Sequence, residues 1–132
     1  MAMSESRTLG VSIGCPLRKA YEFLSAPENF PKWATGLCTS ILKTGDEWLA
    51  ETPERSMTVR FTERNAFGVV DHFIYPAPGA EIYVPMRVIA NGTGSEVIFT
   101  LFRLPEMSDA KFVEDAAWVA RDLRALKELL EA

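Results

Sequence analysis

The most regular hydrophobic pattern in the chain lies in residues 108–131. Its apolar residues recur at alternating steps of four and three, which places them in one stripe along a helix. The stripe consists of Phe112, Ala116, Val119, Leu123, Leu126 and Leu130. Ser108 is placed to cap the helix N-terminus, and no Gly or Pro interrupts the run. The pattern therefore predicts one long helix whose apolar face must bury against a large surface.

The N-terminal part predicts a strand followed by two short helices. Residues 7–14 alternate between apolar and polar side chains, as in a half-buried strand. Pro16 suits the start of a helix, and Pro27 ends the apolar pattern of residues 17–24. A second short helical turn is expected in residues 28–34. The two short helices then form a pair joined at a tight corner.

From Thr35 onward the pattern changes to a period of two, with frequent turn residues between the runs. Six further strands are expected, at residues 37–43, 47–52, 55–63, 67–75, 81–90 and 95–104. Short loops between consecutive strands imply antiparallel neighbours. The expected class is α+β, with residues 1–132 in a single domain. An antiparallel seven-strand sheet would wrap around the long C-terminal helix.

Composition narrows the classes of function. The 132 residues are 48% hydrophobic, enough for a sizeable core, and the formal net charge is −4 without a basic stripe. Nucleic-acid binding is therefore not expected. No apolar run approaches the roughly 20 residues of a membrane span, and no signal-peptide segment follows the polar N-terminus, so a cytoplasmic location is expected.

Cysteine and histidine usage argues against metal and redox chemistry. Cys15 and Cys38 are the only cysteines, and we expect them to be reduced and buried as small apolar residues. One histidine leaves a Cys/His zinc site short of four ligands. No Gly-rich phosphate loop and no nucleophile-elbow motif is present. Neither a metal nor a cofactor is expected.

The turn positions separate the two faces of the sheet. Opposite neighbours are expected at Phe61–Val70, Val59–His72 and Met86–Phe99. The face that meets the long helix would carry Val59, Phe61, Val70, His72, Ile74, Val84, Met86, Val88, Val97, Phe99 and Leu101. His72 is the single polar residue of this set. It is interpreted either as a ligand-orienting group or general base in a cavity, or as a hydrogen-bonded histidine near a strand centre.

The opposite face is too apolar for a surface that only meets water. It would carry Phe73, Tyr75, Tyr83, Ile98 and Phe102, flanked by an Arg60–Asp71 ion pair and by Arg87 beside Glu96. A homodimer through this face is predicted. An N-terminal segment folded across the face, or scattered surface aromatics, are the alternatives.

Several local motifs resemble the START/birch-pollen-allergen superfamily (SRPBCC). They are Cys15-Pro16 after the first strand, the helix of residues 21–25, the corner Pro27-Glu28-Asn29-Phe30-Pro31-Lys32-Trp33, and the strand of residues 94–100 before the final helix. The similarity is to the bacterial polyketide cyclase/dehydrase-like or lipid-transport-like branch. It implies a helix-grip fold, which often leaves an apolar cavity between sheet and helix. The superfamily includes lipid carriers, cyclases, co-chaperone domains and ring-hydroxylase subunits.

This resemblance leads to a functional hypothesis, the binding of a small hydrophobic or amphipathic molecule between sheet and helix. The expected ligand-binding residues are Trp33, Val59, Phe61, Val70, His72, Ile74, Val84, Met86, Phe99, Val119 and Leu123. The alternatives are a polyketide cyclase/dehydratase-like enzyme with His72 as the catalytic group, and a co-chaperone-like protein-interaction domain. Trp118 is expected to be half-exposed or at an interface. Glu114, Asp115 and Asp122 are interpreted as part of the solvated face of the long helix.

Overall fold

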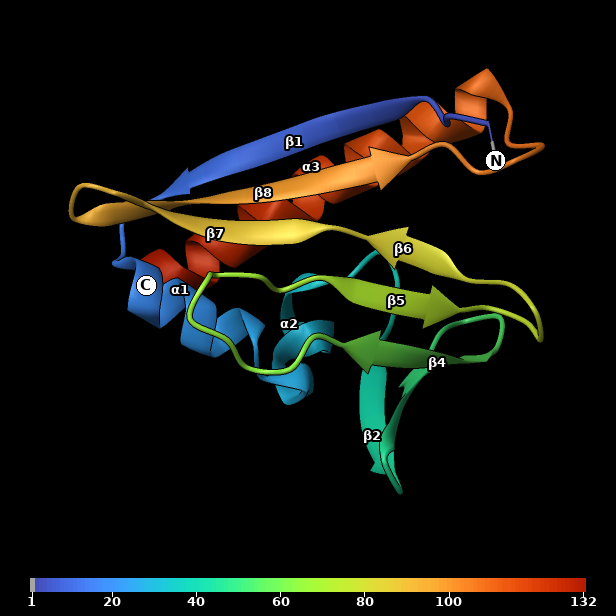
Figure 1. Ribbon diagram of the computed structural model, residues 1–132, viewed down its shortest axis with the longest axis horizontal. Coiled ribbons are helices and arrows are strands. Elements are labelled where there is room, and N and C mark those ends of the chain that lie inside the picture. The colour runs from blue at the N-terminus through green and yellow to red at the C-terminus, as the bar shows by residue number, and fades with distance from the viewer. Residues whose placement is uncertain (1) are drawn as a thin grey trace.

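The chain begins with a strand, turns through short helices, forms seven more strands and ends in a long helix (Figure 1). The computed structural model describes residues 2–132. The elements are β1 (Ser6–Ile13), α1 (Leu17–Leu24), the 3₁₀ turn η1 (Pro27–Asn29), α2 (Phe30–Trp33), β2 (Ser40–Thr44), β3 (Glu47–Glu51), β4 (Ser56–Phe61), β5 (His72–Tyr75), β6 (Ile82–Val84), β7 (Met86–Asn91), β8 (Gly94–Phe102) and α3 (Asp109–Glu131).

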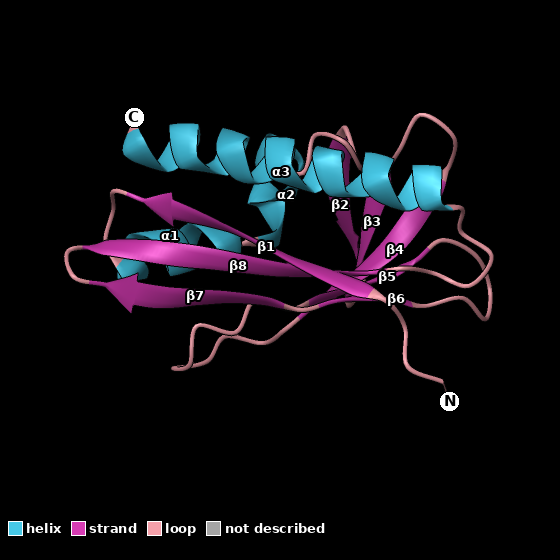
Figure 2. Cartoon of the chain, turned by 90° about the horizontal axis from the view of Figure 1, so that it is seen from above, coloured by secondary structure: helices cyan, strands magenta, loops and turns pink. Residues whose placement is uncertain are grey.

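The strands form two antiparallel sheets, with the orders β1-β8-β7 and β2-β3-β4-β5-β6. Helix α3 runs along one side of both sheets, and α1 and α2 lie on the same side (Figure 2). This architecture confirms the expected α+β helix-grip fold. One predicted strand, at residues 81–90, is divided by Pro85 into β6 and β7. Proline has no amide hydrogen and cannot continue the ladder, so eight strands are present in place of seven.

A buried carboxylate joins the two sheets at this break. Asp71, only 9% exposed, accepts hydrogen bonds from the Met86 amide at 2.8 Å and the Tyr83 hydroxyl at 3.0 Å. The Arg87 guanidinium also pairs with this carboxylate. The predicted pairs of Arg60 with Asp71 and of Arg87 with Glu96 are therefore wrong. The Arg60 guanidinium lies over the Phe73 ring instead, 4.6 Å from its centroid.

Residues 68–70, just before β5, pair with β7. The sequence pattern instead predicts that they pair with β4. The Val88 amide donates to the Gly68 carbonyl at 2.8 Å, and the Val70 amide donates to the Met86 carbonyl at 3.1 Å. Gly68 has a φ of +70°, and a Cβ there would lie 2.2 Å from the Val88 carbonyl oxygen. Only glycine fits this close approach.

This change of partner shifts the register between β4 and β5 by two residues. Phe61 pairs with His72, and Val59 pairs with Ile74, so the expected Phe61–Val70 and Val59–His72 pairs are wrong. The shift is even, so every side chain stays on its expected face. The expected Met86–Phe99 pair is confirmed.

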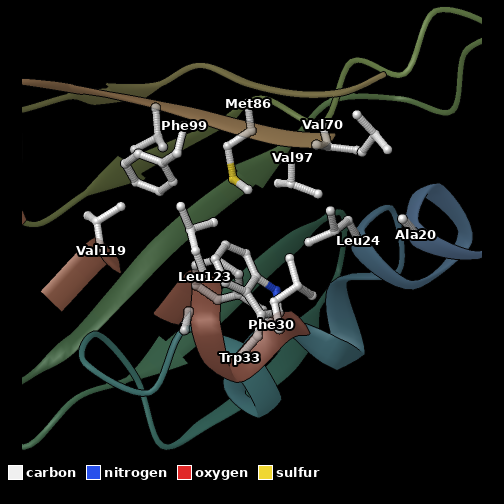
Figure 3. Packing of buried hydrophobic residues seen from close by; sticks show 14 of the residues in the cluster. Ala20, Leu24, Phe30, Trp33, Val70, Met86, Val97, Phe99, Val119 and Leu123 are labelled. Carbon is white, nitrogen blue, oxygen red and sulfur yellow. The ribbon is translucent and has the colours of Figure 1, made fainter. Parts of the chain in front are cut away.

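The apolar stripe of α3 forms one wall of the core. All six predicted stripe residues are buried, and the Ser108 hydroxyl accepts a hydrogen bond from the Lys111 amide at 3.0 Å, as expected for an N-cap. Figure 3 shows Val119 and Leu123 pointing from α3 toward Phe99 and Met86 of the sheet. Both cysteines are buried and free. None of the described helices is long and apolar enough to cross a membrane.

Replacing Leu123 with Ala tests the stripe. Leu123 is 2% exposed, so its truncation should lower the free energy of unfolding by about 2–5 kcal/mol, through lost apolar burial and the cavity left behind. Urea denaturation followed by circular dichroism measures the change. Leu129 is 43% exposed on the same helix, and Leu129→Ala should cost less than about 1 kcal/mol. Equal costs for the two variants would contradict the assigned stripe.

Candidate functional site

A cavity of about 260 Å³ lies between α3, the strands β5, β6 and β8, and the loop after α2. Its wall is mostly aromatic and aliphatic, and includes Phe30, Trp33, Leu37, Ile82, Phe99 and Leu101. Two other depressions have larger volumes, about 970 and 1060 Å³. Both contain several exposed charged residues, such as Arg64 in the first and Glu106 in the second. The smaller cavity, open on one side and lined mostly by apolar side chains, has the anatomy of a small-molecule site.

The structure brings about half of the expected ligand-binding residues to this cavity. Those that line it are Trp33, His72, Ile74, Val84, Phe99 and Val119. Val59 and Phe61 lie instead along the depression beside β3 and β4. Val70, Met86 and Leu123 are buried outside the cavity lining. These three belong to the packed core.

His72 lies in the cavity wall at the start of β5, 3% exposed and surrounded by rings. The ring centroids of Phe30, Trp33 and Phe99 are 5.2, 6.4 and 6.4 Å from its own centroid. Burial lowers the pKa of His72 to about 4, and a hydrogen bond with the Val70 backbone and the charge of Asp71 oppose this shift only in part. The imidazole is therefore neutral at pH 7.

A second stripe on α3 faces the cavity beside the apolar one. Lys111, Asp115, Trp118 and Asp122 follow each other at steps of four, three and four, and all four line the cavity. Lys111 is exposed and Trp118 is 41% exposed, so this side forms the mouth. The interpretation as part of a solvated helix face is therefore wrong for Asp122, which is buried, whereas Asp115 is half-buried and pairs with Lys111. The expected half-exposed Trp118 is confirmed.

Asp122 is the most buried polar group of this stripe, at 9% exposure. Its Oδ1 accepts hydrogen bonds from the Thr35 hydroxyl at 3.2 Å and the Gly36 amide at 3.4 Å. Burial raises the pKa of Asp122 to about 6, although these hydrogen bonds lower it. Desolvation and the nearby Asp122 charge raise the pKa of the Cys38 thiol to about 11. Cys38 is thus an inert thiol next to an acidic group.

The polar stripe could have been found from the sequence. Its spacing repeats that of the apolar stripe one residue earlier, at Lys111 before Phe112, Asp115 before Ala116 and Asp122 before Leu123. A position adjacent to an apolar stripe lies about 100° around the helix, at the boundary of the buried face. These residues were assigned to the solvent-exposed face only because they are charged. Among residues 2–132 no group of three or more His, Cys, Asp or Glu side chains is arranged to hold a metal ion.

Comparison with known proteins identifies the class of fold. No family model matches the sequence, and no curated protein sequence matches it. Similar solved structures are XoxI from Bacillus cereus (TM-score 0.76, 17% identity, covering 97% of this chain and 96% of that one) and the Aha1 dimer from Colwellia psychrerythraea (0.72, 18%, 96% and 96%). The Zhui aromatase/cyclase from Streptomyces sp. R1128 is also similar (0.69, 14%, 98% and 94%).

These similarities extend over nearly the full length of each chain. They show that the chain has the helix-grip fold, the fold that the resemblance found in the sequence implies. Identities of 14–18% establish the fold, and a fold of this kind carries several activities. Function must therefore be argued from the cavity itself.

The pKa of His72 can be measured directly, because it is the only histidine in the chain. We expect the imidazole signals in NMR spectra to titrate with a midpoint near pH 4 and to be those of a neutral ring from pH 6 to 8, because burial disfavours the charged form. A midpoint near the ordinary value of 6.5 would contradict the buried position. Titration of the urea-unfolded protein, expected near 6.5, is the internal control.

Proposed function

We propose that the protein binds a small hydrophobic or amphipathic molecule in the cavity between α3 and the sheets. The observation that carries this proposal is the space of about 260 Å³ between α3 and the sheets, with aromatic walls and polar groups at its open side. This arrangement matches the general anatomy of ligand sites, in which a few polar groups orient a mostly apolar ligand. We further propose that the chain acts as a single domain in the cytoplasm, where its two buried thiols stay reduced.

The cavity volume limits the size of the ligand. An engineered cavity of about 150 Å³ in another protein is large enough for benzene. A space of about 260 Å³ therefore suits a molecule somewhat larger than one ring, such as a bicyclic aromatic compound. A long acyl chain or a polycyclic polyketide would require α3 or the loop after α2 to move outward.

A second candidate is polyketide cyclase/dehydratase-like catalysis with His72 as the acid–base group. Its position in the cavity wall and the shared fold with an aromatase/cyclase favour this candidate. A general base works best with a pKa near the operating pH, whereas the pKa of His72 is lowered to about 4. Such a group orients a ligand by hydrogen bonding more effectively than it removes a proton. Binding is thus better supported than turnover.

Filling the cavity from α3 tests the binding proposal. Val119 lines the cavity and is 8% exposed, so Val119→Phe should occupy the space where a ligand would lie. With indole as the test ligand, we expect the dissociation constant from NMR titration to rise at least about tenfold. Val113 is 61% exposed on the same helix, and Val113→Phe should leave the dissociation constant for indole unchanged. No measurable binding of indole by the wild type, or equal affinities in both variants, would contradict the proposal.

We also propose that two copies associate through the outer sheet face, made up of Phe73, Tyr75, Tyr83, Ile98 and Phe102. The Tyr83 ring stacks on Phe73 at 5.0 Å and on Phe102 at 6.2 Å, and Tyr83 is 39% exposed. This row crosses from the five-stranded to the three-stranded sheet. Exposed charges of both signs flank it, Arg60 on one strand and Glu81 near another. Opposite charges around an apolar centre suit an interface in which the same surface of two copies meets, because each charge can face its opposite on the other copy.

Changing Tyr83 to Asp tests this interface. A charge placed among the stacked rings should shift a wild-type dimer to monomer, as measured by native mass spectrometry. Tyr83→Phe keeps the ring and removes only the hydrogen bond to Asp71, so it should stay dimeric. A wild-type monomer, or a dimer unaffected by Tyr83→Asp, would contradict the proposed homodimer. In that case the outer face would be left for a different protein partner, in line with the co-chaperone-like alternative.

A further inference from the structure

The mouth of the cavity contains more acidic than basic charge among its lining residues. Lys111 is the only basic side chain of the lining, and its ammonium group lies 3.0 Å from the Asp115 carboxylate and 3.5 Å from that of Glu114. Its charge is therefore already matched. Asp122, about two turns after Asp115 and three turns after Lys111 on α3, has no such partner among residues 2–132 and forms no ion pair.

The groups that do bind Asp122 are neutral. They are the Thr35 hydroxyl and backbone amides of the loop after α2. A carboxylate with these partners is partly compensated for its lost hydration, but its charge is not neutralised. An ionised carboxylate in a mostly apolar cavity is most stabilised by a cation that enters the same space. The nearby Arg121 guanidinium is directed elsewhere, over the Trp118 ring at 4.8 Å.

The rings beside Asp122 favour the same kind of ligand. Trp33 and Phe30 form the adjacent wall, whereas the Trp118 ring is already covered by the Arg121 guanidinium and by Gly36. The faces of aromatic rings attract cations, most strongly in the case of tryptophan. An anionic ligand would instead meet a like charge at the mouth. Carboxylate and rings together select for positive charge on one end of an otherwise apolar molecule.

We infer that the ligand of this cavity is an aromatic or aliphatic amine, bound with its ammonium group at Asp122 and its apolar part against Phe99, Ile74 and Val84. The inference rests on the proposed ligand-binding function and specifies the class of ligand. Asp122 acts as a binding residue in direct contact with the ammonium group. His72, neutral and further inside the wall, contacts the apolar part of the ligand.

Three compounds that share the indole ring test the charge preference. Indole measures the apolar cavity alone, tryptamine adds an ammonium group on a two-carbon arm, and indole-3-propionate adds a carboxylate on a similar arm. We expect tryptamine to bind at least about tenfold more tightly than indole-3-propionate in calorimetric titrations at pH 7.5, as is typical of a charge-assisted hydrogen bond. Equal affinities of the two compounds would overturn the inference.

The variant Asp122→Asn separates a ligand contact from a purely structural role. The amide keeps the shape and can still accept hydrogen bonds from Thr35 and Gly36, so the fold should persist. Tryptamine affinity should fall about tenfold, while indole affinity stays within about twofold. Glu114→Gln removes the same charge from the same helix outside the cavity lining and should leave tryptamine affinity unchanged.

The outcomes distinguish failure of the inference from failure of the proposed function. In one outcome indole binds and Val119→Phe abolishes its binding, while tryptamine binds no more tightly than indole-3-propionate. In that case the cavity binds ligands without preference for amines. If Asp122→Asn and Glu114→Gln weaken tryptamine equally, the effect comes from general negative charge, and the assigned contact is wrong. If none of the three compounds binds, the proposed function and the inference both fail.

Discussion

The division of the sheet depends on one carboxylate. Pro85 interrupts the strand run, and Met86 directly after it is almost fully buried, at 1% exposure. An amide buried there without a partner would cost a substantial part of the stability of a small domain. Asp71 accepts that hydrogen bond and also binds Tyr83 and Arg87. Because Asp71 directly precedes β5, the same contact fixes His72 on the inner face and thus sets one wall of the cavity.

Helix α3 completes the cavity because it carries two stripes of different character. The apolar stripe packs over the three-stranded sheet, which lies close to the helix. The polar stripe of Lys111, Asp115, Trp118 and Asp122 faces the cavity, between the five-stranded sheet and the loop after α2, which contacts the helix at Asp122. A helix of uniform apolar character would seal this end, since protein interiors close-pack wherever side chains allow. The polar residues instead leave this end of the cavity open.

Much of the fold could be predicted from the sequence, because the spacing of apolar residues indicates the helices, the strands and their buried faces. The stripe of α3, the capping Ser108, the two short helices and the inner face of the sheet all follow from local spacing and turn residues. The division at Pro85 could also have been read, since a proline inside a strand run signals a break. The hydrogen-bond partners of Asp71 could not be predicted, because they lie on strands that the division of the sheet brings next to Asp71.

The site was predicted less completely, for a related reason. The alternation of inward and outward side chains along a strand predicts that His72 and Phe99 lie on the inner face. The volume of the cavity, however, depends on how far α3 and the loop after α2 lie from the sheet. Asp122 was assigned to solvent because charged residues are usually exposed. Its burial results from Thr35 and Gly36, which are brought against α3 by the corner of the two short helices. Such a contact between distant segments has no local pattern.

The two buried titratable groups of the cavity affect stability in opposite directions. His72 has a pKa of about 4 in the folded chain and near 6.5 when unfolded, so falling pH favours unfolding between these values. Asp122 has a pKa of about 6 when folded and 3.8 otherwise, so falling pH favours folding between 6 and 4. The effects largely cancel in acid. At neutral pH His72 is uncharged in both states, whereas ionised Asp122 still costs stability. A cation bound at Asp122, as inferred above, would offset that cost.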